Sequence, residues 1–135
     1  MVRKYFTIDE AEAIIPSVTR LLTEAQDLKE KLECYESVVL KRRIMTDGSV
    51  AGAAIESEIL DSDLQRLKEA FYAKIEAMEN IGCIIRSLDE GIIDFYARFQ
   101  GEDVFLSWQQ GERKIRYWHR ADEPVTDRKR IIELR

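Results

Sequence analysis

The chain has 135 residues, enough for one folding unit with a real core, but an elongated shape would leave much of it exposed. Charged residues make up 35% of the sequence, well above the usual quarter or so, which fits long solvent-exposed helices. The net charge of −5 excludes a general attraction to nucleic acid or anionic lipid. No run approaches the roughly 20 apolar residues of a membrane span, and no apolar export segment precedes the first helix signal. We therefore expect a cytoplasmic protein without membrane contact.

The first element that the sequence predicts is a long helix beginning at Thr7. Thr7 and Glu10 have the spacing of a capping box, in which each side chain bonds the backbone amide of the other residue. Apolar residues then recur at alternating spacings of four and three, the heptad pattern of a helix that pairs with another helix. Pro16 removes one backbone hydrogen bond, so we expect it to kink this helix or divide it in two. The heptad row is Ile14, Val18, Leu21, Ala25, Leu28, Leu32, Tyr35 and Val39.

A second helix of similar length is predicted from about residue 53 to residue 81, with a turn at residues 46–49 before it and Gly82 as its terminator. The two helices would form an antiparallel, coiled-coil-like hairpin over residues 7–82. Several apolar residues lie outside the pairing rows, and two helices alone cannot cover them. We therefore predict a homodimer or a higher homo-oligomer, or else a protein partner. The uncovered residues are Ile15, Leu22, Val38, Ile55, Ile59 and Tyr72.

After Gly82 the hydrophobic period changes from helical to alternating. A short strand at about 83–86 and three runs at about 92–99, 102–109 and 112–120 predict an antiparallel β-meander of three or four strands. Gln100-Gly101 and Gln110-Gly111 suit the central positions of two-residue hairpin turns. The fold class is therefore α+β in a single domain of residues 1–135: helical hairpin (7–82), meander (83–120) and C-terminal tail (121–135).

Two-residue turns would fix which side chains share a face of the sheet. One face is then apolar and should pack on the helices, and His119 falls on it at the rim. Its rows are Phe95, Leu106, Ile115 and Ala97, Val104, Tyr117. The opposite face carries three mixed rows that resemble a recognition surface or an ordinary solvated face. They are Asp94, Ser107, Lys114; Tyr96, Phe105, Arg116; and Arg98, Asp103, Trp118.

The candidate functional residues gather in the meander and the tail. Asp94, Glu112 and His119 are the candidates for acid–base catalysis, because a carboxylate beside an imidazole can fix its tautomer. The candidates for ligand binding are Asp122, Arg128, Trp118 and Arg116. Alternatively, His119 is structural, bonded to one of Glu102, Glu112 or Asp122.

No metal site or cofactor is predicted. A single histidine without a second His or Cys at ligand spacing argues against zinc. Cys34 and Cys83 lie far apart and fit free thiols. Ser107 lacks the setting of a serine nucleophile, because it is not flanked by glycines and precedes no helix.

The two ends of the chain carry a specific set of residues: Phe6, Thr7, Glu10, Ala11, Pro16, Gly91, Asp94, Phe95, Gly101, Val104, Leu106, Trp108, Gly111, Glu112, Ile115, Trp118, His119 and Arg128. In this set the chain resembles the domain of unknown function 2203 family of bacteria and archaea. The resemblance implies a shared fold and candidate residues, and it groups Asp94, Glu112, Trp118, His119 and Arg128, but it implies no activity. Ser107 stands where the family usually has cysteine, which argues against a thiol nucleophile there, and Pro124 stands where the family usually has glycine.

Three functions compete on this sequence. The first is a non-enzymatic, homo-oligomeric interaction or structural module, which explains the heptads and the high charge. The second is a small enzyme or ligand-binding protein with hydrolase-like acid–base chemistry, in which Arg128 holds a carboxylate or phosphate. The third, nucleic-acid binding, rests on the basic triplets at residues 41–43 and 128–130 and is disfavoured by the net charge. We favour the first hypothesis and lean against an enzyme.

Overall fold

The computed structural model describes residues 4–45 and 51–131. Two helices, α1 (Ile8–Met45) and α2 (Ala51–Ile81), precede the strands β1 (Cys83–Ser87), β2 (Ile92–Phe99), β3 (Glu102–Gln109) and β4 (Tyr117–Arg120). A 3-10 turn, η1 (Val125–Asp127), and a short strand, β5 (Lys129–Arg130), follow. The α+β prediction is confirmed, with a fifth strand in what the sequence suggested was a tail. The turn predicted at residues 46–49 lies outside the described residues.

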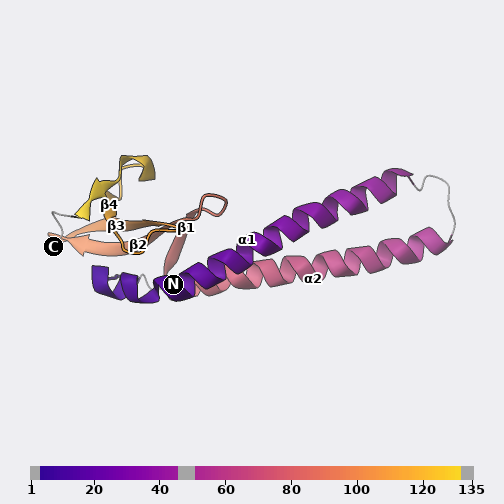
Figure 1. Cartoon of the computed structure of the whole chain (residues 1–135), viewed down its shortest axis with the longest axis horizontal. Coiled ribbons are helices and arrows are strands. Elements are labelled where there is room, and N and C mark those ends of the chain that lie inside the picture. The colour runs from indigo at the N-terminus through magenta and orange to yellow at the C-terminus, as the bar shows by residue number, and fades with distance from the viewer. Residues whose placement is uncertain (1–3, 46–50, 132–135) are drawn as a thin grey trace.

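The two helices form the predicted hairpin, and the sheet covers only one end of it (Figure 1). The sheet is antiparallel in the order β1-β2-β3-β4-β5. The far ends of both helices project beyond it (Figure 1), and we call this projection, which runs to Met45 at the end of α1 and starts again at Ala51 of α2, the arm. No helix among residues 4–45 and 51–131 is both long and apolar enough to cross a membrane.

The capping box that begins α1 is present. The Thr7 amide donates to Glu10 Oε1, and the Glu10 amide donates to Thr7 Oγ1, each at 3.1 Å. Pro16 lies inside one continuous helix, so the predicted division of α1 is wrong. The buried residues Ile15 and Val18 flank Pro16 and belong to the main core, and their packing holds the helix together there.

The apolar face of the sheet packs on the first half of α1, and together they form the core. Ile15 and Leu22, which the hairpin alone could not cover, are buried in it at 8% and 0% exposure. Val38 and Tyr72 remain exposed at 41% and 64%, and the side chains of Ile55 and Ile59 lie outside the described residues. Other large members of the core are Phe6, Leu21, Met78, Ile93, Phe95, Leu106, Trp108, Ile115, Trp118 and Ile131.

The first hairpin turn was predicted correctly and the second was not. Gln100 and Gly101 both have positive φ (52° and 78°), and β2 pairs with β3 through the expected partners from Asp94 and Ser107 to Phe99 and Glu102. After Gln109, however, the chain leaves the sheet and returns only at Tyr117. Leu106 therefore pairs with Trp118 and not with Ile115, so the rows predicted for β4 are wrong.

The contacts of the loop between β3 and β4 explain this departure. The Gln110 amide donates to the Gly91 carbonyl at 2.8 Å, and the side chains of Gln110 and Gln26 exchange hydrogen bonds at 2.8 and 3.1 Å. Further along, the Ile115 amide donates to Glu12 Oε1 at 3.2 Å. These bonds to α1 and to Gly91 replace the ladder that a two-residue turn would have continued.

Gly82 sits where α2 ends, with φ of +115° and the Phe6 ring against it. A methyl group at this position would lie 2.8 Å from Cε1 of Phe6, too close without a shift of a core ring. Gly111 offers a matched control, because its φ is +101° but nothing lies within 4 Å of the position of its missing Cβ.

We predict that Gly82→Ala lowers the free energy of unfolding by at least about 1 kcal/mol more than Gly111→Ala does. Both variants carry the backbone cost of a positive φ, roughly 1 kcal/mol, but only Gly82→Ala also displaces Phe6. Urea unfolding of the two variants and the parent measures the difference. Equal losses would show that the Phe6 contact does not constrain Gly82.

Candidate functional site

The side of the sheet that faces away from α1, here called the outer face, carries a buried polar cluster. Asp94 on β2, Ser107 on β3 and His119 on β4 are exposed by 0%, 0% and 2%. Asp94 Oδ2 accepts a hydrogen bond from Arg86 Nε at 2.9 Å and lies 2.7 Å from His119 Nε2. These contacts join β1, β2 and β4, and we call them the Asp94 bridge.

Both ring nitrogens of His119 face oxygen acceptors. Nδ1 lies 3.0 Å from the carbonyl oxygen of Arg120 and 3.1 Å from that of Glu123, so it must carry a hydrogen to bond them. Nε2 lies 2.7 Å from Asp94 Oδ2 and is engaged by that carboxyl group. Neither ring nitrogen faces a nucleophile, so this geometry does not form a Ser–His–Asp triad.

Ser107 lies beneath the Asp94 bridge, because it pairs with Asp94 on one side and with Tyr117 on the other. Its small side chain leaves room for Asp94 and His119 to meet over β3. Ser107 Oγ and Asp94 Oδ1 are buried without a hydrogen-bond partner among the described residues. Unpartnered buried polar atoms are rare in folded proteins, so these two mark the outer face as unusual.

Glu112 and Arg128 form a second, separate pair. Arg128 Nη1 lies 3.5 Å from Glu112 Oε1, and the guanidinium carbon lies 4.3 Å from the centre of the Tyr117 ring. Glu112 also shapes the β3–β4 loop: its carboxylate accepts from the Gln109 amide at 2.6 Å, and its carbonyl accepts from Trp108 Nε1 at 2.8 Å. These contacts stabilise the loop, and none of them is with Asp94.

The remaining candidates do not join the Asp94 bridge. The predicted faces of Trp118 and His119 are exchanged: Trp118 is buried in the core with its Nε1 3.2 Å from the Arg130 carbonyl, and His119 lies on the outer face. Asp122 and Arg116 are exposed. Glu123, and not Asp122, contacts His119, through its carbonyl oxygen 3.1 Å from Nδ1, and its side chain accepts from the Arg120 amide at 3.1 Å and from Lys129 Nζ at 2.9 Å.

Sequence reasoning missed Arg86, and its structural interpretation of His119 named the wrong partners. That interpretation named Glu102, Glu112 and Asp122, whereas the partners are two backbone carbonyls and Asp94, which was grouped with His119 only for acid–base catalysis. The available signal was a charged Arg86 at the end of an apolar strand, one short loop before Asp94. In an antiparallel pair those two positions come together, and a buried carboxylate needs such a partner.

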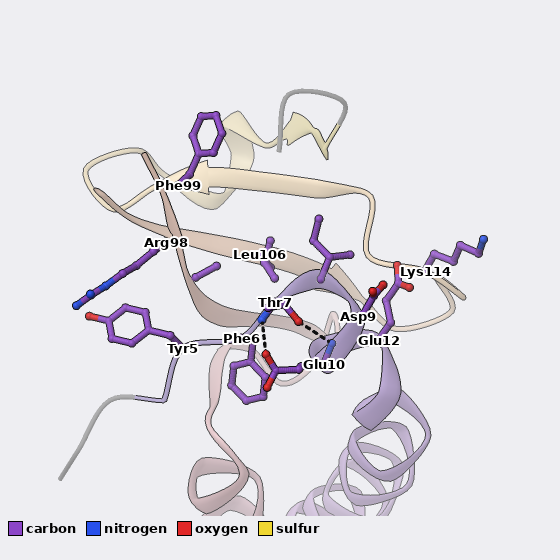
Figure 2. Close-up of a pocket in the computed structure, with 12 residues that line it drawn as sticks. Tyr5, Phe6, Thr7, Asp9, Glu10, Glu12, Arg98, Phe99, Leu106 and Lys114 are labelled. Atoms are coloured by element: carbon purple, nitrogen blue, oxygen red, sulfur yellow. Dashed lines mark hydrogen bonds between the residues drawn. The ribbon is translucent and has the colours of Figure 1, made fainter. Parts of the chain in front are cut away.

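A groove of about 730 Å³ lies between the first turn of α1 and the ends of β2 and β3 (Figure 2). Its floor is apolar, with Ala97, Leu106 and the half-buried Phe99. Tyr5 and Arg98 stand at one end, and Asp9, Glu12 and Lys114 at the other (Figure 2). Glu10 on the rim is engaged in the capping box, and Glu12 accepts from the Ile115 amide, so both carboxylates already serve the fold. Among the described residues, no three His, Cys, Asp or Glu side chains gather to hold a metal ion.

We predict that His119→Ala lowers the free energy of unfolding by about 2–4 kcal/mol, because it leaves the buried Asp94 without its imidazole partner. His119→Gln should lose less than half as much, since its amide can reach Asp94 but not the carbonyls of Arg120 and Glu123. Chemical denaturation of both variants measures the two losses. Equal stability of His119→Ala and the parent would contradict a structural role for the Asp94 bridge.

Burial raises the pKa of the Cys83 thiol to about 12 from its usual 9.0. The folded thiol therefore stays neutral at pH 7–9, whereas Cys34 is exposed. We predict that one thiol per chain reacts with a disulfide reagent in native buffer and two react in urea. Because the unfolded Cys83 ionises above about pH 9 while the folded one does not, its contribution to stability should fall between pH 9 and 12. Rapid reaction of both thiols in the folded protein would refute this.

Comparison with known proteins assigns the chain to a family but identifies no activity. Searches of curated proteins and of solved structures found no match. A family model described as "Uncharacterized conserved protein (DUF2203)" matches residues 4–131, nearly the whole chain. That span contains both helices, the whole sheet and every residue of the Asp94 bridge. The chain therefore belongs to the DUF2203 family of uncharacterised conserved proteins.

Proposed function

We propose that this protein is a homo-oligomeric interaction module that associates through its helical hairpin. The main observation behind the proposal is that side chains of α1 are more completely buried than those of α2. In α1, Val18, Leu22 and Ala25 are fully buried. In α2, Met78 is the only buried side chain among those described at residues 61–81, although the helix has a complete apolar row.

Met78 reaches the core that the sheet forms, but the described residues of the row at 64–75 are not part of that core. Leu64, Leu67, Phe71 and Ile75 are all half-buried, and Tyr72 beside them is 64% exposed. On the arm, Val38 and Leu40 are exposed at 41% and 60%. Continuous, incompletely covered apolar rows are typical of surfaces that a second chain covers. The two free thiols suit a reducing compartment, and a cytoplasmic location is part of the proposal.

The two alternatives have less support. For an enzyme, His119 has no free ring nitrogen, and Asp122 and Arg116 stand apart from the Asp94 bridge. For nucleic-acid binding, the cations of the outer face are matched by acids: Arg86 with Asp94, Arg98 with Asp103, and Arg128 with Glu112. Each pair reduces the positive field that a polyanion needs.

We predict that light scattering at tens of micromolar gives twice the chain mass, and that Tyr72→Glu shifts the protein towards monomer. A charge at position 72 would have to be buried in the interface, at a cost of several kcal/mol. Ala73→Glu is the matched control, because it adds the same charge at the neighbouring exposed position on another side of the helix. A monomeric parent would contradict the proposal, and equal dissociation of both variants would contradict its use of the Tyr72 side of α2.

A further inference from the structure

A row of aromatic rings crosses the outer face from β4 to the segment before α1. The ring centres of His119 and Phe105 are 5.2 Å apart, those of Phe105 and Tyr96 4.9 Å, and those of Tyr96 and Tyr5 6.1 Å. His119 and Phe105 are buried, whereas Tyr96 and Tyr5 are half-buried. The rings at the β4 end of the row are therefore shielded from solvent, whereas those at the Tyr5 end are partly accessible to a ligand.

Two arginines lie on this row. The guanidinium carbon of Arg86 is 4.7 Å from the centre of the Phe105 ring, and that of Arg98 is 4.3 Å from the centre of the Tyr5 ring. Each is also held at Nε by a carboxylate: Arg86 by Asp94 at 2.9 Å and Arg98 by Asp103 at 3.5 Å. Ring and hydrogen bond together fix the plane and direction of the Arg86 guanidinium group, whereas Arg98 is more exposed and has the longer contact with its carboxylate.

One edge of the Arg86 guanidinium group makes no hydrogen bond to the described residues. Its contacts with the described residues are the ring beneath it and the bond from Nε to Asp94, so the hydrogens on its two Nη atoms remain for another acceptor. The side chain is 36% exposed although the Asp94 below it is fully buried. A planar guanidinium matches a carboxylate with two parallel hydrogen bonds. An arginine already held in place loses little side-chain entropy when it binds one.

We propose that the part of this row from Arg86 to Arg98 is a docking surface for an acidic segment of a partner protein. One carboxylate of the segment takes the free edge of Arg86, and a second contacts Arg98, which is 63% exposed. Tyr96, which lies between the two arginines along the row, and Tyr5, beside Arg98, pack against the stems of the partner's side chains. Interfaces are enriched in Arg and Tyr arranged in this way.

The chemistry favours an acidic protein segment over single-stranded nucleic acid. Bases need open ring faces on which to stack, but guanidinium groups lie over Phe105 and Tyr5. Two separate carboxylates need only the two arginines.

The test is an NMR titration of the full chain with a synthetic hexaglutamate peptide at low ionic strength, following the Nε–Hε signals of the arginines. We expect the Arg86 and Arg98 signals to shift together along one saturating curve. Arg98→Gln should weaken binding about tenfold, the usual effect of losing a charge-assisted hydrogen bond, and it leaves the Asp94 bridge untouched. Arg86→Lys, which keeps the charge but loses the planar fork, should weaken binding similarly.

Arg113→Gln is the control, because it removes the same charge from an exposed position in the β3–β4 loop, and it should leave the affinity within about twofold. Four results would overturn the proposal: no saturable shift up to millimolar peptide; equal weakening by Arg113→Gln; tighter binding of a thymidine oligonucleotide of the same length; or a changed mass of Arg98→Gln by light scattering. The last would make a second copy the occupant.

Discussion

The carboxylate of Asp94 is fully buried, and much of the sheet is arranged to satisfy it. A buried charge without partners costs several kcal/mol, so the fold must bring donors to it. Arg86 comes from β1 and His119 from β4, on either side of the β2–β3 pair. Since neighbouring strand residues point to opposite faces, placing His119 on the outer face sends Trp118 into the core. The same register thus supplies the polar partner of Asp94 and one of the largest side chains of the core.

The sequence predicted those parts of the fold that depend on local chemistry. The Thr7–Glu10 capping box, the end of α2 at Gly82 and the turn at Gln100-Gly101 each depend on residues close together in the chain. The second turn could not be predicted in the same way, although Gln110-Gly111 has the same two residue types as Gln100-Gly101. There the decisive bonds join Gln110 to Gln26 and Ile115 to Glu12, partners more than 80 residues away.

That one error carried through to the candidate site. A two-residue turn would put His119 on the apolar face and Trp118 on the outer face, and the structure has the reverse. Asp94 and His119 were both recognised as candidates, but their direct contact could not be derived from the wrong register. Arg86 was missed because its role depends on where the strands lie in space.

The molecule therefore combines two surfaces that differ in character. In the hairpin, the apolar row of α2 is only half-buried at residues 64, 67, 71 and 75, which supports the proposed self-association. On the outer face, Arg86 lies over the Phe105 ring and Arg98 over the Tyr5 ring, and the same face carries the buried polar residues Asp94, Ser107 and His119. Because they lie on different elements, the two surfaces can be tested and altered separately.

The most direct test of this account is the state of the His119 ring, observed by long-range proton–nitrogen NMR of the folded protein. The account predicts a hydrogen at Nδ1 of the His119 ring that exchanges slowly with water, together with nuclear Overhauser contacts between the ring and Phe105. A His119 ring that exchanges freely with solvent, or that contacts core residues such as Leu106 in place of Phe105, would contradict the register and the Asp94 bridge together.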